Sequence, residues 1–331
     1  MEVVVVGSGA LGGLVGALLD RRHDVTMVGR ERQVAAIADR GLAVEGVESF
    51  RARPAATTAW DGRADLGVVA VKAHDTPGAA ATLAAGTVGA VVPLGNGMGA
   101  EATLADRLAA PVVAGTATLG ATAPEPGRVA WRGRGRVAVG PWTADAGRAA
   151  RRAGAAFRTA GVPTTVTDAI RERLWEKLAV NAAINPLTAL TGTRNGAVAA
   201  APLDGVAAAA AREVAAVARS RGIDLPDERA VAAVREVARA TADNRSSMAR
   251  DLAAGRRTEV DAINGYAVEA APDPGSVPVN RTLAALVRAR ESATDGREEA
   301  GSDPDPDAGA EAETGTETGT AADGPAGQSG G

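Results

Sequence analysis

The sequence predicts an α/β protein whose first domain is a doubly wound parallel sheet and whose second domain is all-α. Up to about residue 167, short apolar runs alternate with helical patterns, as in right-handed βαβ units that cover both faces of a parallel sheet. From residue 168 to about residue 292, strand-like runs cease and Ala-rich helical patterns follow one another. The length of 331 residues also exceeds what one hydrophobic core usually serves.

The first domain is expected to alternate strands and helices. Its strands are predicted over 3–6, 25–28, 68–71, 90–93 and 112–114, with helices over 11–22, 33–40, 76–85 and 100–108 between them. The segment 127–140 (GRVAWRGRGRVAVG) favours an antiparallel hairpin, and a helix over 143–160 and a strand over 162–166 complete the domain. In the second domain, helices are predicted over 168–190, 202–221, 227–241, 247–254, 259–271 and 280–291.

The charge of the chain is divided unevenly. Lys and Arg number 36 against 40 Asp and Glu, a net charge of −4. Residues 293–331 hold ten of the acids and one base, so they carry −9 and leave +5 for residues 1–292. Their Gly, Pro, Ser, Thr and acidic composition predicts a disordered, solvated tail, with an interaction tail as the alternative.

The composition excludes several classes of site. Without cysteine there are no disulfides, thiolate zinc sites or Cys nucleophiles, and two histidines, His23 and His74, argue against a His metal cage or a Ser-His-Asp triad, so no metal is expected. Seven aromatic residues argue against a stacking platform for nucleic acid. With no membrane-length apolar run and a strand at the very N-terminus, we expect a cytoplasmic protein with neither membrane nor nucleic-acid partners.

A glycine fingerprint opens the chain. The valine run at 3–6 leads directly into Gly7-Ser8-Gly9-Ala10-Leu11-Gly12. The first glycine permits the tight turn, the second lets a pyrophosphate approach the backbone, and the third lets helix and strand pack closely. The helix N-terminus then offers free N–H groups and partial positive charge to the phosphates. Residues 1–167 are therefore interpreted as a Rossmann-type dinucleotide-binding domain.

The end of the second strand indicates which dinucleotide binds. NAD-specific domains usually place a carboxylate there for the ribose 2′-hydroxyl, whereas this strand ends in Gly29-Arg30. The Arg30 guanidinium suits a 2′-phosphate through a charge-assisted fork, so NADPH is the expected cofactor. Glu31 would be the ribose ligand if the register slipped by one. Lys72 and Asn96 follow two further strands, where open α/β sheets bind their ligands.

A polar stripe marks the first helix of the second domain. Arg173, Lys177, Asn181 and Asn185 are spaced four apart and so share one helix face. Asn is a mediocre helix former, so the stripe predicts a set of donors for a small anionic, oxygen-rich ligand, and a solvated face is the alternative.

A second polar cluster lies further along the chain. Asn244 and Ser247 are three apart on one face, and Glu259 begins another helix, where it could simply complement the helix dipole.

These segments together resemble the ketopantoate reductases (2-dehydropantoate 2-reductases), over about residues 1–292. The matching pieces, in order, are Gly7–Gly12, Val71–Ala73, Asn96–Gly99, Glu176–Asn181, Asn185–Ala189, Asn195–Gly196, Asn244–Met248 and Thr258–Asp261. His74 departs from the pattern, because the family often has an aromatic residue after Lys-Ala. The resemblance thus implies an NADP-binding Rossmann domain (1–167) and an all-α substrate and catalytic domain (168–292), and it leaves out the predicted disordered acidic tail (293–331).

The resemblance also implies an activity and residue roles. It implies NADPH-dependent reduction of 2-dehydropantoate to (R)-pantoate in pantothenate and coenzyme A biosynthesis, by a monomer or homodimer. Lys177 is implied as the proton donor, and Glu259 as a catalytic residue that also meets the cofactor. The other implied cofactor contacts are the Gly7–Gly12 fingerprint, Arg30, Lys72, Asn96 and Ala121, and the implied substrate ligands are Asn96, Lys177, Asn181, Asn185, Asn195, Asn244, Arg245, Ser246 and Ser247. A reductase of another small 2-oxo acid, or a non-catalytic NADPH sensor, would be compatible with the same fold.

Overall fold

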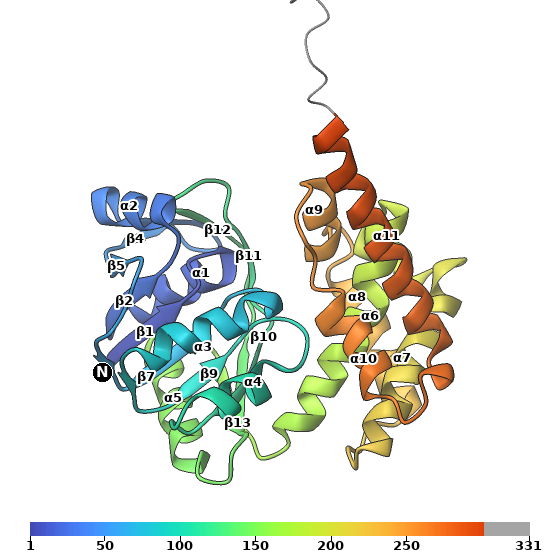
Figure 1. Ribbon diagram of the computed structural model, residues 1–331, viewed down its shortest axis with the longest axis horizontal. Coiled ribbons are helices and arrows are strands. Elements are labelled where there is room, and N and C mark those ends of the chain that lie inside the picture. Colours follow the sequence, from blue (N-terminus) through green and yellow to red (C-terminus); the bar gives the residue numbers. More distant parts are fainter. Residues whose placement is uncertain (301–331) are drawn as a thin grey trace, which may run out of the picture.

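The protein consists of a mixed α/β part and a helical part joined by one long helix, as the computed structural model shows (Figure 1). The structure describes the backbone of residues 1–300 and the side chains of residues 1–293. The helix that leads from one part to the other is α6 (Ile170–Thr191), which follows strand β14 (Thr164–Val166). The predicted fold class is confirmed, and the predicted boundary at 167/168 falls in the turn between these two elements.

The central sheet of the N-terminal part is parallel and doubly wound. Its five strands run in the order β5-β2-β1-β7-β9, so the chain builds outward from β1 in both directions. These strands are β1 (Glu2–Val6), β2 (Asp24–Val28), β5 (Ala55–Thr57), β7 (Leu66–Val69) and β9 (Val91–Pro93). The carboxyl ends of β1, β7 and β9 therefore lie side by side, where a doubly wound sheet binds its ligand.

Alternate valines of β1 pack into opposite layers. Val3 and Val5 join a core that contains residues of α1 and α5, whereas Val4 and Val6 join a core that contains residues of α3 and α4. This is the period-two alternation of a strand buried on both faces. The covering helices are α1 (Ala10–Leu19), α2 (Glu31–Arg40), α3 (Thr76–Ala84), α4 (Ala100–Arg107) and α5 (Gly147–Thr159).

The predicted hairpin over 127–140 is wrong. Strand β12 (Arg128–Gly133) pairs with β3 (Leu42–Gly46) and β11 (Gly120–Thr122), while β13 (Val137–Pro141) pairs with β10 (Val113–Ala117) and β14. The two strands thus belong to different sheets. The short link between them passes so close to the chain that a Cβ on Gly135 would lie 2.5 Å from the Thr118 carbonyl. Alternation reveals a strand but not its partner: β12 forms its hairpin with the preceding strand β11, and its other partner, β3, is distant in sequence.

Short strands outside the central sheet were not predicted. Strand β4 (Phe50–Ala52) pairs with β3, and β6 (Arg63–Ala64) pairs with β8 (Thr87–Val88). With two or three residues each, β4, β6, β8 and β11 are too short to show a hydrophobic period of their own, and the five-residue β3 ends in the exposed Glu45 and Gly46.

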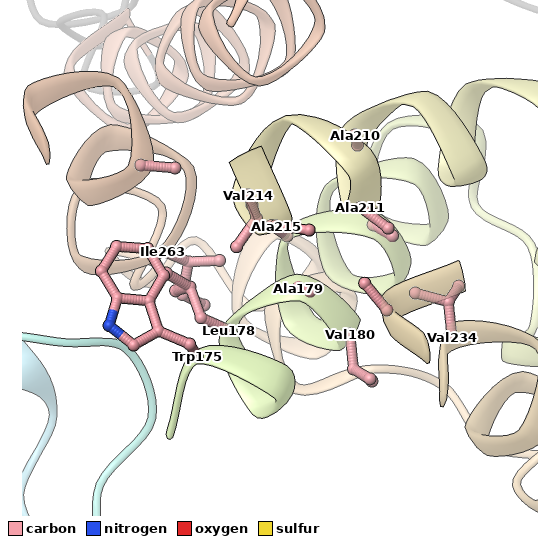
Figure 2. Packing of buried hydrophobic residues seen from close by; sticks show 14 of the residues in the cluster. Trp175, Leu178, Ala179, Val180, Ala210, Ala211, Val214, Ala215, Val234 and Ile263 are labelled. Atoms are coloured by element: carbon pink, nitrogen blue, oxygen red, sulfur yellow. The ribbon is translucent and has the colours of Figure 1, made fainter. Parts of the chain in front are cut away.

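Small side chains hold the helical part together. Figure 2 shows Trp175, Leu178 and Val180 of α6 among residues that include Ala211 and Val214 of α7, all members of one buried cluster. Alanine at the contacts lets the helix axes approach closely. The other helices are α7 (Leu203–Ser220), α8 (Asp227–Ala240), α9 (Ser247–Ala253), α10 (Tyr266–Ala270) and α11 (Pro278–Ala300).

Two predicted helices differ in detail. The helix expected over 259–271 is a π-helical turn, Asp261–Gly265, followed by the short α10. The last helix continues to Ala300, beyond its predicted end at residue 291, and the remainder of the predicted tail, residues 301–331, lies outside the described residues. Within residues 1–300, no helix combines the length and apolar character needed to cross a bilayer.

A buried side-chain amide replaces the backbone hydrogen bond that Pro186 removes from α6. Pro186 has no N–H to give to the carbonyl of Ala182, four residues earlier. The Asn264 side chain donates to that carbonyl instead, at 2.9 Å, and also donates to Asn280 Oδ1 at 2.9 Å. Asn280 in turn donates to Glu213 Oε2 of α7 at 2.7 Å. This network fixes the helix that carries the polar stripe.

Candidate active site

The strand ends of the N-terminal part meet the segment before α10. The Met98 N–H donates to the Ala262 carbonyl at 2.9 Å. Gly97 has φ +80°, and a Cβ there would lie 2.6 Å from Ala262 Cβ, so only glycine allows this approach. The loop after β9 is therefore docked against the helical part, and Asn96 lies within it.

Glu259 lies buried at this junction, with 8% of its surface exposed. Its Oε1 accepts the Ala73 N–H and its Oε2 accepts the Asn96 amide, each at 3.2 Å. Burial raises the pKa of the Glu259 carboxyl, opposed by these two hydrogen bonds and by the charges of Lys72 and Lys177. The structure thus brings Glu259 together with three other residues predicted for the site, Asn96, Lys72 and Lys177, and Glu259 has partners from both strand ends rather than a simple helix-dipole role.

Lys177 faces the same region from α6. Its Nζ donates to the Ala117 carbonyl of β10 at 3.1 Å. Burial lowers the pKa of Lys177 to about 8, opposed by the negative charges of Glu259 and Glu101. A cationic group that releases its proton near neutral pH suits general acid catalysis.

The other three residues of the polar stripe on α6 differ in how deeply they are buried. Asn185 is buried at 7% exposure, Asn181 is half-buried next along the same face, and Arg173 is exposed. The structure therefore groups Lys177, Asn181 and Asn185 toward the interior and leaves Arg173 in solvent.

The predicted cluster around residue 244 divides in two. The Asn195 N–H donates to the Asn244 carbonyl at 3.0 Å, so these two predicted ligands are joined. Asn195 Nδ2 donates to Thr241 Oγ1 at 2.9 Å, while its buried Oδ1 has no partner within the described residues. Asn244 and Arg245 are exposed.

Ser246 serves the fold. Its buried Oγ caps α9 by accepting the Ala249 N–H at 3.0 Å and also accepts the Thr188 hydroxyl at 2.8 Å. The hydroxyl is thus already engaged, whereas the neighbouring Ser247 is half-buried and begins the helix.

The glycine fingerprint has the form that a dinucleotide requires. Gly7 has φ +104°, and a Cβ on Gly12 would lie 1.8 Å from the Gly7 carbonyl oxygen, so both are needed for the turn. A Cβ on Gly9 would meet nothing within 4 Å, so the backbone there stays open to an approaching phosphate. Ser8 packs against Gly29, where a Cβ would lie 1.9 Å from Ser8 Oγ.

The remaining cofactor-side residues surround this turn. Arg30 is exposed as the N-cap of α2, directly after β2, and Glu31 is exposed as the first residue of that helix. Ala121 and Leu11 are partly buried at the edge of one core. These positions fit NADPH, with Arg30 as the cation nearest the end of β2.

Lys72 bridges the two parts of the molecule. It pairs with Asp251 Oδ2 at 2.9 Å and donates to the Arg257 carbonyl at 2.7 Å. The predicted cofactor contact thus lies at the same junction as Glu259.

One signal in the sequence was overlooked. Lys72 and Lys177 are its only lysines, the other 34 of its 36 basic side chains being arginine, and the structure places both at the junction. Arginine cannot release its proton in proteins, whereas a lysine can, so Lys177 is an exception that fits a proton donor. Glu101 was also missed; it is a buried acid two residues after Gly99 that faces Lys177, and no local pattern in the sequence marks its burial.

Known families match both parts of the chain. Residues 3–144 match the family model described as ketopantoate reductase PanE/ApbA, and residues 169–291 match the model of its C-terminal region. The chain belongs to the ketopantoate reductase family. These enzymes are oxidoreductases that use NADPH, and the expected family, enzyme class and cofactor are confirmed.

Relatives in this family cover nearly the whole described chain. The 2-dehydropantoate 2-reductase of Halobacterium salinarum is 40% identical over 298 residues, which cover 87% of this chain and 98% of that protein. The enzyme of the same name from Archaeoglobus fulgidus is also 40% identical, over 88% of this chain and 98% of its own. The crystal structure of a PanE/ApbA family ketopantoate reductase from Ralstonia eutropha is 33% identical, with a TM-score of 0.79 over 89% of this chain and all of its own.

A solved structure of a differently named enzyme shares the fold. D-mandelate dehydrogenase in complex with NADH and anilino(oxo)acetate superimposes with a TM-score of 0.84 over 89% of this chain and 99% of its own, at 22% identity. This likeness concerns the architecture alone.

Proposed function

We propose that the protein reduces 2-dehydropantoate to (R)-pantoate with NADPH, and that Lys177 donates the proton to the carbonyl oxygen. The observation that supports this role is the position of Lys177, a half-buried lysine with a pKa near 8 that shares a helix face with Asn181 and Asn185 and lies opposite Glu259. Such a reaction would supply pantoate for pantothenate and coenzyme A biosynthesis.

The residues of the site divide the work. NADPH, when bound, supplies the hydride. Lys177 neutralises the negative charge that develops on the carbonyl oxygen and transfers its proton there. Asn181 and Asn185 offer amide donors beside it and, with Asn195, Asn244 and Ser247, would hold the oxygens of the substrate.

The cofactor end is held by other residues. Glu259 keeps Asn96 oriented through the hydrogen bond at 3.2 Å, so the loop after β9 presents this side chain in a fixed position at the junction of the two parts. The free N–H groups of the Gly7–Gly12 turn would bind the pyrophosphate, and Arg30 would bind the 2′-phosphate. Exclusion of water between the two parts strengthens the electrostatic interaction between the Lys177 ammonium and the carbonyl oxygen.

The decisive experiment is an NADPH-oxidation assay with 2-dehydropantoate, run in parallel with NADH and with smaller 2-oxo acids. The proposal expects kcat/KM to be highest for 2-dehydropantoate with NADPH. Preference for a smaller 2-oxo acid would assign a different substrate, and tight NADPH binding without turnover of any of them would indicate a sensor. A preference for NADH would remove the role given to Arg30.

A cytoplasmic location and action as a monomer or homodimer belong to the same proposal. Sedimentation of the full chain, and fractionation of cells that express it, would test both.

A further inference from the structure

Glu101 is a buried acid that the proposed reaction leaves unexplained. It is the second residue of α4, directly after Gly99 and Ala100, and only 3% of its surface is exposed. A carboxylate is rarely buried unless it is paired or hydrogen-bonded, so its position calls for a partner. Two backbone N–H groups, its own at the helix N-terminus and that of Gly115, serve it in part.

One edge of β10 receives both Glu101 and Lys177. The antiparallel pairing of β10 with β13 continues through the Thr118 N–H, which donates to the Arg136 carbonyl at 3.0 Å, so the even-numbered residues direct their peptide groups toward β13. The peptide groups of Gly115 and Ala117 therefore point to the opposite edge. There the Gly115 N–H donates to Glu101, and the Ala117 carbonyl accepts from Lys177 Nζ at 3.1 Å. The carboxylate and the ammonium thus occupy successive places on one strand edge.

The charged groups around this pair are few. Lys177 faces the carboxylates of Glu259 and Glu101, and Glu101 faces Lys177 and Arg171. The hydroxyl of Tyr266, whose ring lies 5.9 Å from that of Trp175, also faces Glu101. Burial raises the pKa of Glu101 to about 7 and lowers that of Lys177 to about 8, and each charge favours the ionised form of the other.

The two carboxylates near Lys177 have different hydrogen-bond partners. Glu259 is tied to Ala73 and Asn96 at the cofactor end, at 3.2 Å each. Glu101 has no hydrogen bond to that end, and α4 and β10 hold it in place. We propose that Glu101 is a positioning residue, the resident counter-ion that keeps the Lys177 ammonium charged and directed along the edge of β10 between turnovers. This inference rests on the proposed role of Lys177 as proton donor.

The chain itself makes the test direct. Because it has only two lysines, protein labelled with ¹³C-lysine gives two lysine signals, which a Lys72→Arg variant assigns, and a pH titration reports the pKa of each. In Glu101→Gln, the pKa of Lys177 should fall by about one unit, the lower end of the effect of a nearby opposite charge. Lys72 should not change. Asp106→Asn, on the exposed face of the same helix, is the matched control and should alter neither.

Activity provides the second measurement. The alkaline limb of the kcat profile should move to lower pH in Glu101→Gln by the same amount, and Glu101→Asp should restore part of it, because it keeps the charge. A folded Glu101→Gln protein with the wild-type pKa at Lys177 would overturn the proposal. The titration needs no turnover, so it separates this inference from the proposed function, which fails if the wild-type protein does not reduce 2-dehydropantoate.

A variant that does not fold still leaves a test. In a Glu259→Gln protein, Glu101 is the carboxylate that remains opposite Lys177. The Lys177 signal should then show a second, smaller inflection as Glu101 ionises near pH 7. A single inflection would refute the coupling.

Discussion

At the scale of single residues, the site depends on where a proton can be held. Lys177 is one of two lysines in a chain whose other basic residues are all arginine. Its ammonium donates to a strand carbonyl and faces two buried carboxylates. Substitutions of Lys177 can test the contribution of its positive charge separately from that of its transferable proton.

We expect Lys177→Ala to lower kcat by at least about 100-fold, the lower end of general-acid effects. Lys177→Arg should also lose most of the rate, because a guanidinium keeps the charge but cannot release a proton. Steady-state NADPH oxidation measures both, with Arg173→Ala, exposed one turn earlier on the same helix, as the control. Near-wild-type turnover by Lys177→Ala would remove the lysine from the chemistry.

The same proton predicts a pH dependence. A general acid must be protonated, so kcat should be level below the pKa of Lys177, about 8, and fall tenfold per unit above it. Single-turnover rates across the pH range check this, since they report the chemical step without product release. A rate that rises through pH 8 would instead require a base at this position.

At the scale of elements, two glycines of the turn between β1 and α1 have separable roles, one in folding and one in cofactor binding. Gly12→Ala should destabilise the protein, because its Cβ would lie 1.8 Å from the Gly7 carbonyl oxygen. Gly9→Ala places its Cβ in open space, so it should fold normally but bind NADPH more weakly, since the methyl group occupies the approach of the pyrophosphate. Thermal unfolding and fluorescence titration measure the two effects. Equal NADPH affinity in Gly9→Ala would place the cofactor elsewhere.

Local patterns predicted much of the fold and of the site. The strand at 3–6, the fingerprint after it and the stripe on α6 are each readable from a few consecutive residues. Strands β3 and β4 are neighbours in sequence and were missed because their local pattern is weak, whereas the wrong hairpin at 127–140 depends on the distant strand β3, which no local period contains. Glu101 was missed for that second reason, because its partners Gly115 and Lys177 come from other elements.

The proline in α6 predicts a coupling between elements. Asn264→Ala should cost about 1–3 kcal/mol, because it leaves the Ala182 carbonyl buried without its donor. In a Pro186→Ala background the restored backbone N–H can serve that carbonyl, so the same substitution should cost less. Denaturant unfolding of the four proteins in a double-mutant cycle measures the difference. Strictly additive effects would mean that Asn264 does not replace the missing N–H.

At the scale of the whole molecule, the two parts are joined at the site itself. Glu259 and Ala262 bond across the junction to the loops after β7 and β9, and Lys177 bonds across it to β10. In the opposite direction, Lys72 of the loop after β7 bonds to Asp251 and Arg257 of the helical part. The C-terminal helix supports this side, since Glu291 Oε1 accepts the Thr258 N–H next to Glu259, at 2.6 Å.

These contacts predict that the chain can be shortened after Ala300. Residues 301–331 hold seven acids and no base, so their removal changes the net charge from −4 to +3. Every contact described for the site comes from residues up to 291, so kcat and thermal stability should be unchanged. The magnitude of the net charge changes only from 4 to 3, so repulsion between molecules, and with it solubility, should change little. Assays of the full and shortened chains at several salt concentrations test this, and a loss of kcat that salt does not reverse would give these residues a part in catalysis.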